Sequence, residues 1–116
     1  MNIEDLPPGT PALKDSSVRI QGMRVELLFA LLAASRIWAE LGYALVITSL
    51  NDGRHSWTSL HYSGSAADLR IRHMRTGDAA RATEELQAAL GIDFDVVLEE
   101  DHIHVEYQPK RRGLEG

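Results

Sequence analysis

The sequence predicts an α+β domain in which a mostly antiparallel sheet is backed by two helices. Three observations carry this prediction: two segments with apolar residues at helical spacing, several short segments of alternating apolar and polar residues, and an order of helix, strands, helix and a final pair of strands. The chain has 116 residues, of which 44% are hydrophobic and 25% charged, as expected for one domain with a sizeable core. We therefore expect a single domain over residues 1–116.

The first helix is predicted over about residues 22–41. Its apolar residues recur at spacings of four and three, which places them on one helical face: Leu27, Leu31, Ala34, Trp38 and Leu41. Gly42 can adopt the left-handed conformation that ends a helix. The apolar run 27–34 is far shorter than the roughly 20 residues needed to cross a bilayer. This segment is therefore expected to be a core helix.

The remaining elements follow from shorter patterns. Strands are expected over residues 44–48, 65–72, 94–99 and 102–107, and a second helix over 78–90. Asp78 is expected to cap this helix and Gly91 to end it, while the segment 51–53 has turn chemistry. The two ends, about 1–17 and 109–116, lack periodicity, and we expect them to lie loosely outside the core.

Composition excludes several classes of function. The absence of cysteine excludes disulfides and thiolate metal sites, so a transition metal would need histidine and carboxylate ligands. With 17 acidic and 12 basic residues and a net charge of -5, the chain is not expected to bind nucleic acid or to insert into a membrane. Its first residues lack the basic start and apolar stretch of a secretion signal. An activity outside the cytoplasm would then depend on another factor for release.

Two predicted strands carry polar side chains on one face. Alternation places Asp68 on the face of its strand opposite the apolar residues. In the last strand the polar face is formed by His102, His104 and Glu106. If both strands lie in one sheet, Asp68 and His104 converge on the same side, and a turn at Gly64 can fold His61 back over Asp68. Two imidazoles and one carboxylate would supply three ligands of a tetrahedral zinc ion and leave the fourth position for water or substrate.

Two segments resemble the motifs of a known family. Residues 59–69 read SLHYSGSAADL, which is similar to the Ser-x-His-x-x-Gly-x-Ala-x-Asp signature of the zinc D,D-carboxypeptidase and L-alanyl-D-glutamate endopeptidase family. The fold of that family is shared with the Hedgehog signalling domain. Residues 101–106, DHIHVE, resemble its second motif. The resemblance spans about residues 48–107, and the compact chain is similar in length to small phage-encoded members.

This resemblance implies a role for each matching residue. His61, Asp68 and His104 would bind Zn²⁺, and Asp101, three positions before the late histidine, would act as the general base. The implied activity is zinc-dependent hydrolysis of a peptide bond in bacterial peptidoglycan stem peptides, by a carboxypeptidase or an endopeptidase. The implied setting is a phage lysis enzyme (endolysin) made in the host cytoplasm and released by another factor, or a protein of the bacterial cytoplasm.

Each ligand assignment has an alternative. His61 and Asp68 could instead be a turn histidine hydrogen-bonded to a strand aspartate. His102 faces the same way as His104 and could be the true ligand, although the spacing to Asp101 favours His104.

The assigned base and the neighbours of the ligands also have alternatives. Asp101 could belong to the solvated acidic run 99–101, and strand parity would place it opposite His104 unless the strand begins or bends there. Glu106 and His102 are expected beside the ligands, where Glu106 could hydrogen-bond a ligand histidine. An exposed strand glutamate is the competing interpretation.

The substrate-binding residues are less clearly marked. Family members often carry an arginine shortly after a Thr-Ser at the end of the preceding strand, but here the first arginine after that point is Arg54. Arg70, Arg72 or no residue at all could take its role. Trp57 and Tyr62 are expected to line a peptide groove, or else to cover the edge of the core. A zinc-bearing domain that binds peptide or protein without cutting, such as a phage structural or assembly component, is the alternative function.

Overall fold

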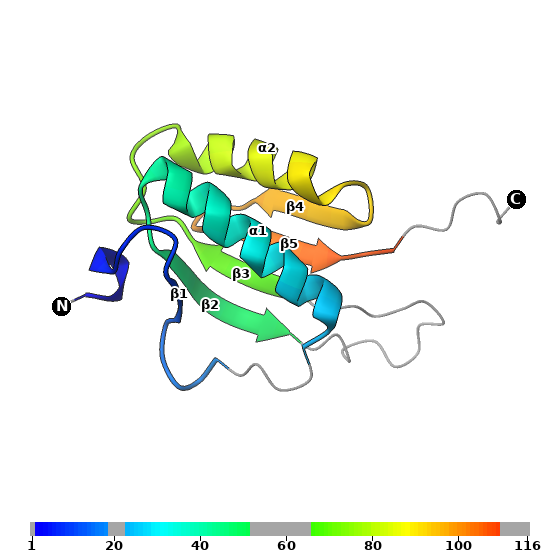
Figure 1. Ribbon diagram of the computed structural model, residues 1–116, viewed down its shortest axis with the longest axis horizontal. Coiled ribbons are helices and arrows are strands. Elements are labelled where there is room, and N and C mark those ends of the chain that lie inside the picture. Colours follow the sequence, from blue (N-terminus) through cyan, green and yellow to red (C-terminus); the bar gives the residue numbers. More distant parts are fainter. Residues whose placement is uncertain (1, 19–22, 52–65, 110–116) are drawn as a thin grey trace, which may run out of the picture.

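The computed structural model describes residues 2–18, 23–51 and 66–109 and has an α+β architecture (Figure 1). Two helices, α1 and α2, cover one face of a five-stranded sheet. The elements in chain order are the 3-10 helix η1 (Ile3–Asp5), β1 (Pro11–Leu13), α1 (Val25–Leu41), β2 (Leu45–Asn51), β3 (Ala66–Arg70), α2 (Asp78–Leu90), β4 (Phe94–Leu98) and β5 (His102–Tyr107). The predicted fold class is therefore confirmed at the level of an α+β domain.

The sheet is mixed, with the strand order β1-β2-β3-β5-β4. β1 pairs with β2 in parallel, whereas the pairs β2–β3, β3–β5 and β4–β5 are antiparallel. β3 lies at the centre and β5 beside it, so these two strands have paired neighbours on both sides. The prediction of a mostly antiparallel sheet backed by two helices is confirmed for the described residues.

The N-terminal segment corrects one expectation. Residues 1–17 were expected to be loose, but η1 and β1 belong to the fold, and β1 forms an edge of the sheet. Gly9 donates its backbone N–H to the Tyr43 carbonyl, and its own carbonyl accepts a hydrogen bond from the Ser35 hydroxyl on α1. A three-residue strand that begins with Pro11 shows no usable alternation, which is why the pattern did not reveal it.

Glycines lie at the ends of both helices, but the residue predicted to cap the start of α2 does not do so. Gly42 ends α1 in the left-handed conformation, with φ of 96°, and its N–H donates to the Trp38 and Ala39 carbonyls. The predicted cap at Asp78 is wrong, because Gly77 occupies the N-cap position and the Asp78 carboxylate accepts a hydrogen bond from the Tyr43 hydroxyl. α1 also begins at Val25, three residues later than predicted.

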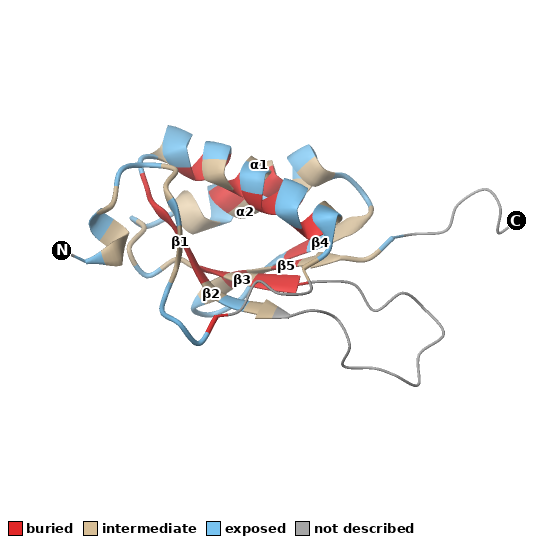
Figure 2. Cartoon of the chain, turned by 60° about the horizontal axis from the view of Figure 1, so that its bottom comes forward, coloured by how far each residue is buried: buried red, intermediate tan, exposed pale blue. Residues whose placement is uncertain are grey.

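The core lies between the helices and the sheet (Figure 2). Trp38 and Leu27 on α1 are fully buried, as are Leu69 on β3 and Ile103 on β5. Leu69 pairs with Ile103 across the two strands, so both point toward the helices. Because side chains alternate along a strand, their neighbours Asp68 and His104 must point to the opposite face of the sheet.

Candidate metal centre

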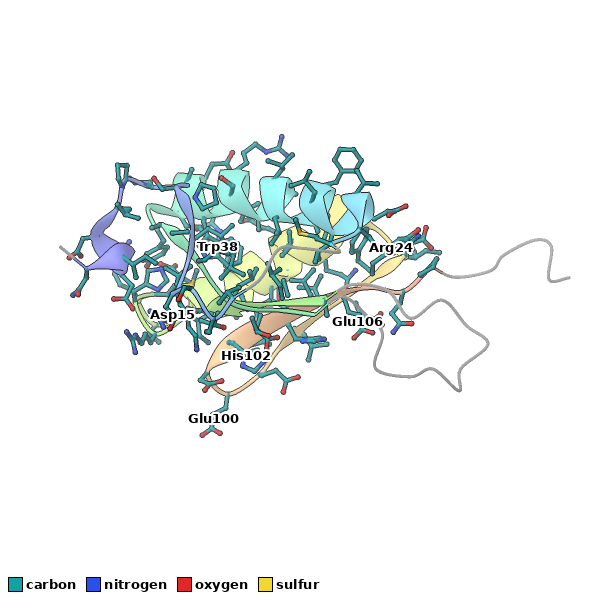
Figure 3. All side chains as sticks on the ribbon, turned by 90° about the horizontal axis from the view of Figure 1, so that it is seen from below. Asp15, Arg24, Trp38, Glu100, His102 and Glu106 are labelled. Atoms are coloured by element: carbon teal, nitrogen blue, oxygen red, sulfur yellow. The ribbon has the colours of Figure 1, made fainter. Side chains whose placement is uncertain are left out.

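The pairing of β3 with β5 places the predicted polar faces next to each other. Asp68 lies directly opposite His104 in the register, and Arg70 lies opposite His102. Figure 3 shows His102 and Glu106 on the side of the sheet away from α1. The convergence of Asp68 with His104, expected from strand alternation, is thus present in the structure.

Three side chains form a cluster of donor atoms able to hold a metal ion. The Nδ1 atom of His104 lies 2.7 Å from Asp68 Oδ1, and the Nε2 atom of His102 lies 3.5 Å from the same oxygen. Ligand atoms of Asp68, His102 and His104 all lie within 4.8 Å of one another. Ligands of a tetrahedral zinc ion are about 3.3 Å apart for bonds of about 2.0–2.1 Å, so small side-chain rotations would suffice. Two imidazoles and one carboxylate are also a donor set that suits zinc.

Two further carboxylates contact the far side of the imidazole rings. Glu106 Oε1 lies 3.1 Å from His104 Nε2, and Asp101 Oδ1 lies 2.7 Å from His102 Nδ1. An ionised carboxylate only accepts hydrogen bonds, so these ring nitrogens must donate. In both histidines this leaves the other nitrogen on the side of Asp68. Carboxylates that orient histidines in this way are typical of the surroundings of metal sites.

Opposing effects act on the pKa of His104. Partial burial lowers its pKa, but the hydrogen bonds to Asp68 and Glu106 and their negative charges outweigh burial, and the pKa is raised above the ordinary value of 6.5. Both ring nitrogens face carboxylates in the metal-free protein, which favours the doubly protonated ring. A metal ion that binds at Nδ1 would displace one of these protons and leave the Nε2–H bond to Glu106 in place.

Asp101 lies at the edge of the cluster rather than inside it. It immediately precedes β5, so the strand-parity argument against it does not apply. Its carboxylate contacts His102, whose other nitrogen faces Asp68, and its side chain is 85% exposed. The hydrogen bond from His102 lowers the pKa of Asp101 below its ordinary value. The predicted general base therefore lies one imidazole away from Asp68.

Irregular pairing of β2 with β3 shapes the other side of the cluster. The register shifts between Ile47 and Ser49, which leaves Thr48 in a bulge, and Ser49 then pairs with Asp68. The Thr48 hydroxyl donates to the Asp68 backbone carbonyl at 3.3 Å. Bulges of this kind are common beside functional sites because they redirect neighbouring side chains.

Several predicted site residues lie outside the described residues. These are His61, the third predicted ligand, and the predicted substrate-binding residues Arg54, Trp57 and Tyr62. Among the described residues, the structure brings together Asp68 and His104 and adds His102, which the sequence placed beside the ligands. The sequence signal was that His102 and His104 are two residues apart and therefore lie on the same face of one strand. The register of β5 against β3 then places that face beside Asp68.

Comparisons with models of known protein families, with curated proteins and with solved structures found no match. Among the residues that the structure describes, no helix has the length and apolar character needed to cross a membrane. The described residues define an α+β domain with a histidine–carboxylate cluster on the face of the sheet away from the helices.

Proposed function

We propose that this protein is a zinc-dependent hydrolase that cleaves a peptide bond in bacterial peptidoglycan stem peptides. The observation that carries the proposal is the convergence of Asp68, His102 and His104, with ligand atoms within 4.8 Å of one another. The resemblance of residues 59–69 and 101–106 to the two peptidase motifs supplies the substrate class. A Hedgehog/DD-peptidase-like arrangement of the fold is part of the same proposal, and a sheet with helices on one face supports it.

Asp68 and His104 are the two metal ligands in this proposal that also lie within the described residues. The motif assigns the third ligand position to His61. In the structure, the imidazole of His102 also has a nitrogen close to Asp68, though farther away than that of His104. Zinc contents of His61→Ala and His102→Ala decide between them. Loss of zinc from His61→Ala alone supports the motif, whereas loss from His102→Ala alone assigns the third position to His102.

The chain's own residues supply the proton transfers. Zinc in a site with an open position activates water at about neutral pH and polarises the scissile carbonyl. Asp101 takes the proton of the attacking water and delivers it to the departing amine. This role needs the Asp101 side chain to turn away from His102, which its 85% exposure allows. Release from His102 also removes the hydrogen bond that lowers the Asp101 pKa and makes it a stronger base.

Substitution of Asp101 tests this role. Asp101→Asn should retain zinc and lose most turnover, about 10²- to 10⁴-fold, because the amide cannot accept the proton. Zinc content by atomic absorption and the rate of product release would be measured together. Full activity in this variant would move the base to another group, with Glu106 or Glu100 the next to test.

The reaction itself is tested on purified peptidoglycan. Zinc-loaded protein is incubated with the wall material, with the His61→Ala and Asp68→Asn variants alongside, and the soluble fragments are identified by mass spectrometry. New peptide termini that are absent with both variants would support a peptidase and identify the bond. No release from several wall types, despite bound zinc, would contradict it.

A non-cutting zinc domain is the second candidate function. The contact of Asp101 with His102 favours this candidate, because the carboxylate assigned as the general base is hydrogen-bonded to the His102 ring and orients it instead. Four exposed apolar side chains on α1 also suit a protein-binding role: Val25, Leu28, Phe29 and Leu32. Stoichiometric zinc without turnover would support this alternative.

A further inference from the structure

An apolar stripe runs along the outward side of α1 in the first half of the helix (Figure 2). Its members follow helical spacing and therefore share one face: Val25, Leu28, Phe29 and Leu32. These side chains are 42–60% exposed, whereas Leu27 and Leu31 on the opposite side of the helix are buried in the core. The first half of α1 is thus apolar on both its inward and its outward side.

The stripe is long enough to serve as a contact surface and has a defined end. A helix that is apolar nearly all round is normally buried on every side. Beyond Leu32 the outward positions become polar, with Arg36 and Glu40 exposed. The four side chains of the stripe, at these exposures, present roughly 400 Å² of apolar surface, a size that often marks an interaction site.

The spacing of the stripe is the same when it is read from either end. A two-fold axis at the midpoint between Leu28 and Phe29 would therefore pack two antiparallel copies of α1 with matching side chains. Leu28 would contact the partner's Phe29, and Val25 would contact the partner's Leu32. Closed two-fold pairs of this kind, in which one surface contacts itself, are the commonest oligomers.

Two charged residues beside the stripe are complementary in the same arrangement. At 3.6 residues per turn, Glu26 and Arg36 project to the same side of the stripe, about 4 Å before and about 11 Å after its midpoint. In an antiparallel pair, Arg36 lies about 8 Å along the axis from the partner's Glu26, and the two side chains lean toward each other, since helical side chains tilt toward their own N-terminus. Glu26 is 34% exposed, and among the residues that the structure describes none forms an ion pair with the exposed Arg36.

We propose that the stripe on α1 binds the same stripe of a second copy of this chain, in a two-fold dimer with antiparallel α1 helices. The proposal does not depend on the peptidase function. The net charge of -5 disfavours an anionic membrane as the occupant. A contact of this size is about half the roughly 800 Å² per partner of a stable interface, so we expect a weak dimer with a dissociation constant on the order of 0.1 mM. Because α1 and the histidine–carboxylate cluster lie on opposite faces of the sheet, both clusters remain open in the dimer.

Sedimentation velocity of the full chain, from about 10 μM to about 1 mM, measures the association around the expected dissociation constant. Wild type should change from monomer toward dimer over this range. Phe29→Gln should weaken association about 10-fold or more, because it removes a large aromatic side chain from the centre of the contact. Ile92→Gln is the matched control: Ile92 is 59% exposed against 60% for Phe29, but it lies between α2 and β4, so this variant should associate as wild type does.

Charge reversal tests the antiparallel arrangement. Glu26→Lys and Arg36→Glu should each weaken association by about 5- to 30-fold at low salt, because a dimer contains two such pairs and both become repulsive. An equimolar mixture of the two variants should recover association, since every introduced charge then faces an opposite charge on the partner. Within one helix, Glu26 and Arg36 are about 15 Å apart along the axis, so recovery cannot come from a pair inside one chain.

Three outcomes would overturn the proposal. A wild-type chain that stays monomeric over the whole range would leave the α1 face to a different protein. Association that is equal in Phe29→Gln and wild type would place the contact on another surface. A mixture of Glu26→Lys and Arg36→Glu that associates no better than either variant alone would exclude the antiparallel pair. Circular dichroism of each variant checks that it is folded.

Discussion

At the scale of single residues, His104 links protonation to the metal site. In the metal-free protein its two ring nitrogens face Asp68 and Glu106, and both contacts are made best by the charged ring. A metal ion needs the neutral ring at the ligating nitrogen, so binding must release a proton. Zinc and protons therefore compete for the same atom.

The raised pKa of His104 sets the sign of a pH effect on stability. The contribution of this group is fully present below its ordinary pKa of 6.5 and is lost as pH rises through the higher folded-state value. The metal-free protein should thus lose stability from this source as the pH rises above 6.5 and through the higher folded-state pKa. Urea unfolding at a series of pH values from below 6.5 upward, on wild type and Glu106→Gln, checks this. A variant with the same pH slope as wild type would show that Glu106 does not raise the pKa.

Glu106 should matter for metal affinity as well. Glu106 accepts a hydrogen bond from the Nε2–H of His104 and thereby orients the ring with Nδ1 toward Asp68. Glu106→Gln should weaken zinc binding by about 10- to 100-fold, the usual effect of removing a carboxylate that orients a ligand histidine. Competition with a zinc-responsive dye measures it. Glu100→Gln, an exposed acidic neighbour in the chain, is the control and should bind zinc as wild type does.

At the scale of the elements, the register of β3 against β5 creates the cluster. Asp68 and His104 are 36 residues apart in the chain and meet because they are direct cross-strand partners. A shift of one residue would turn one set of polar side chains toward the helices, which the buried Leu69 and Ile103 prevent. The core residues thus fix the geometry of the polar face.

Attachment of the N-terminal segment to α1 predicts a contrast between two glycines. A Cβ on Gly9, where φ is 83°, would lie 2.7 Å from the Ala39 Cβ and 3.1 Å from the Ser35 carbonyl oxygen. Gly42 also has a positive φ, but a Cβ there would meet no atom within 4 Å. Gly42→Ala should cost about 1 kcal/mol for the backbone alone, and Gly9→Ala about 2–4 kcal/mol because overpacking is added.

Urea unfolding of both alanine variants measures this difference. Equal losses would mean that the segment around Gly9 moves away from α1 at little cost. In that case the contacts of η1 and β1 would contribute little to stability.

At the scale of the whole molecule, the helices cover one face of the sheet and the cluster lies on the other. A ligand of the folded state alone raises stability by mass action, and zinc at about 100 times its dissociation constant should add about 2.7 kcal/mol to the free energy of unfolding. Asp68→Asn should abolish this increment and Glu100→Gln should retain it. Thermal melts with and without zinc provide the measurement. A zinc increment that persists in Asp68→Asn would place the ion elsewhere.

Much of the architecture could be predicted from local patterns. The helix 78–90 and the strand 102–107 have the bounds that periodicity and alternation indicated, and Gly42 ends α1 as expected. The strand at Pro11–Leu13 could not be predicted, because three residues carry no period and their partner is more than 30 residues away. The prediction that Asp78 caps α2 failed for a related reason, since its carboxylate accepts a hydrogen bond from the hydroxyl of Tyr43, which is distant in the sequence.

The sequence by itself determined which side chains share a face: Asp68 on one strand, and His102, His104 and Glu106 on another. It did so because alternation along a strand is a local property of the backbone. The tertiary structure alone decided that Asp68 faces His104, that Asp101 contacts His102, and that Glu4 pairs with the arginines of β3 and of the turn after it. These relations depend on strand order, register and the path of the N-terminal segment, which are set by burial of the shared core rather than by any local pattern.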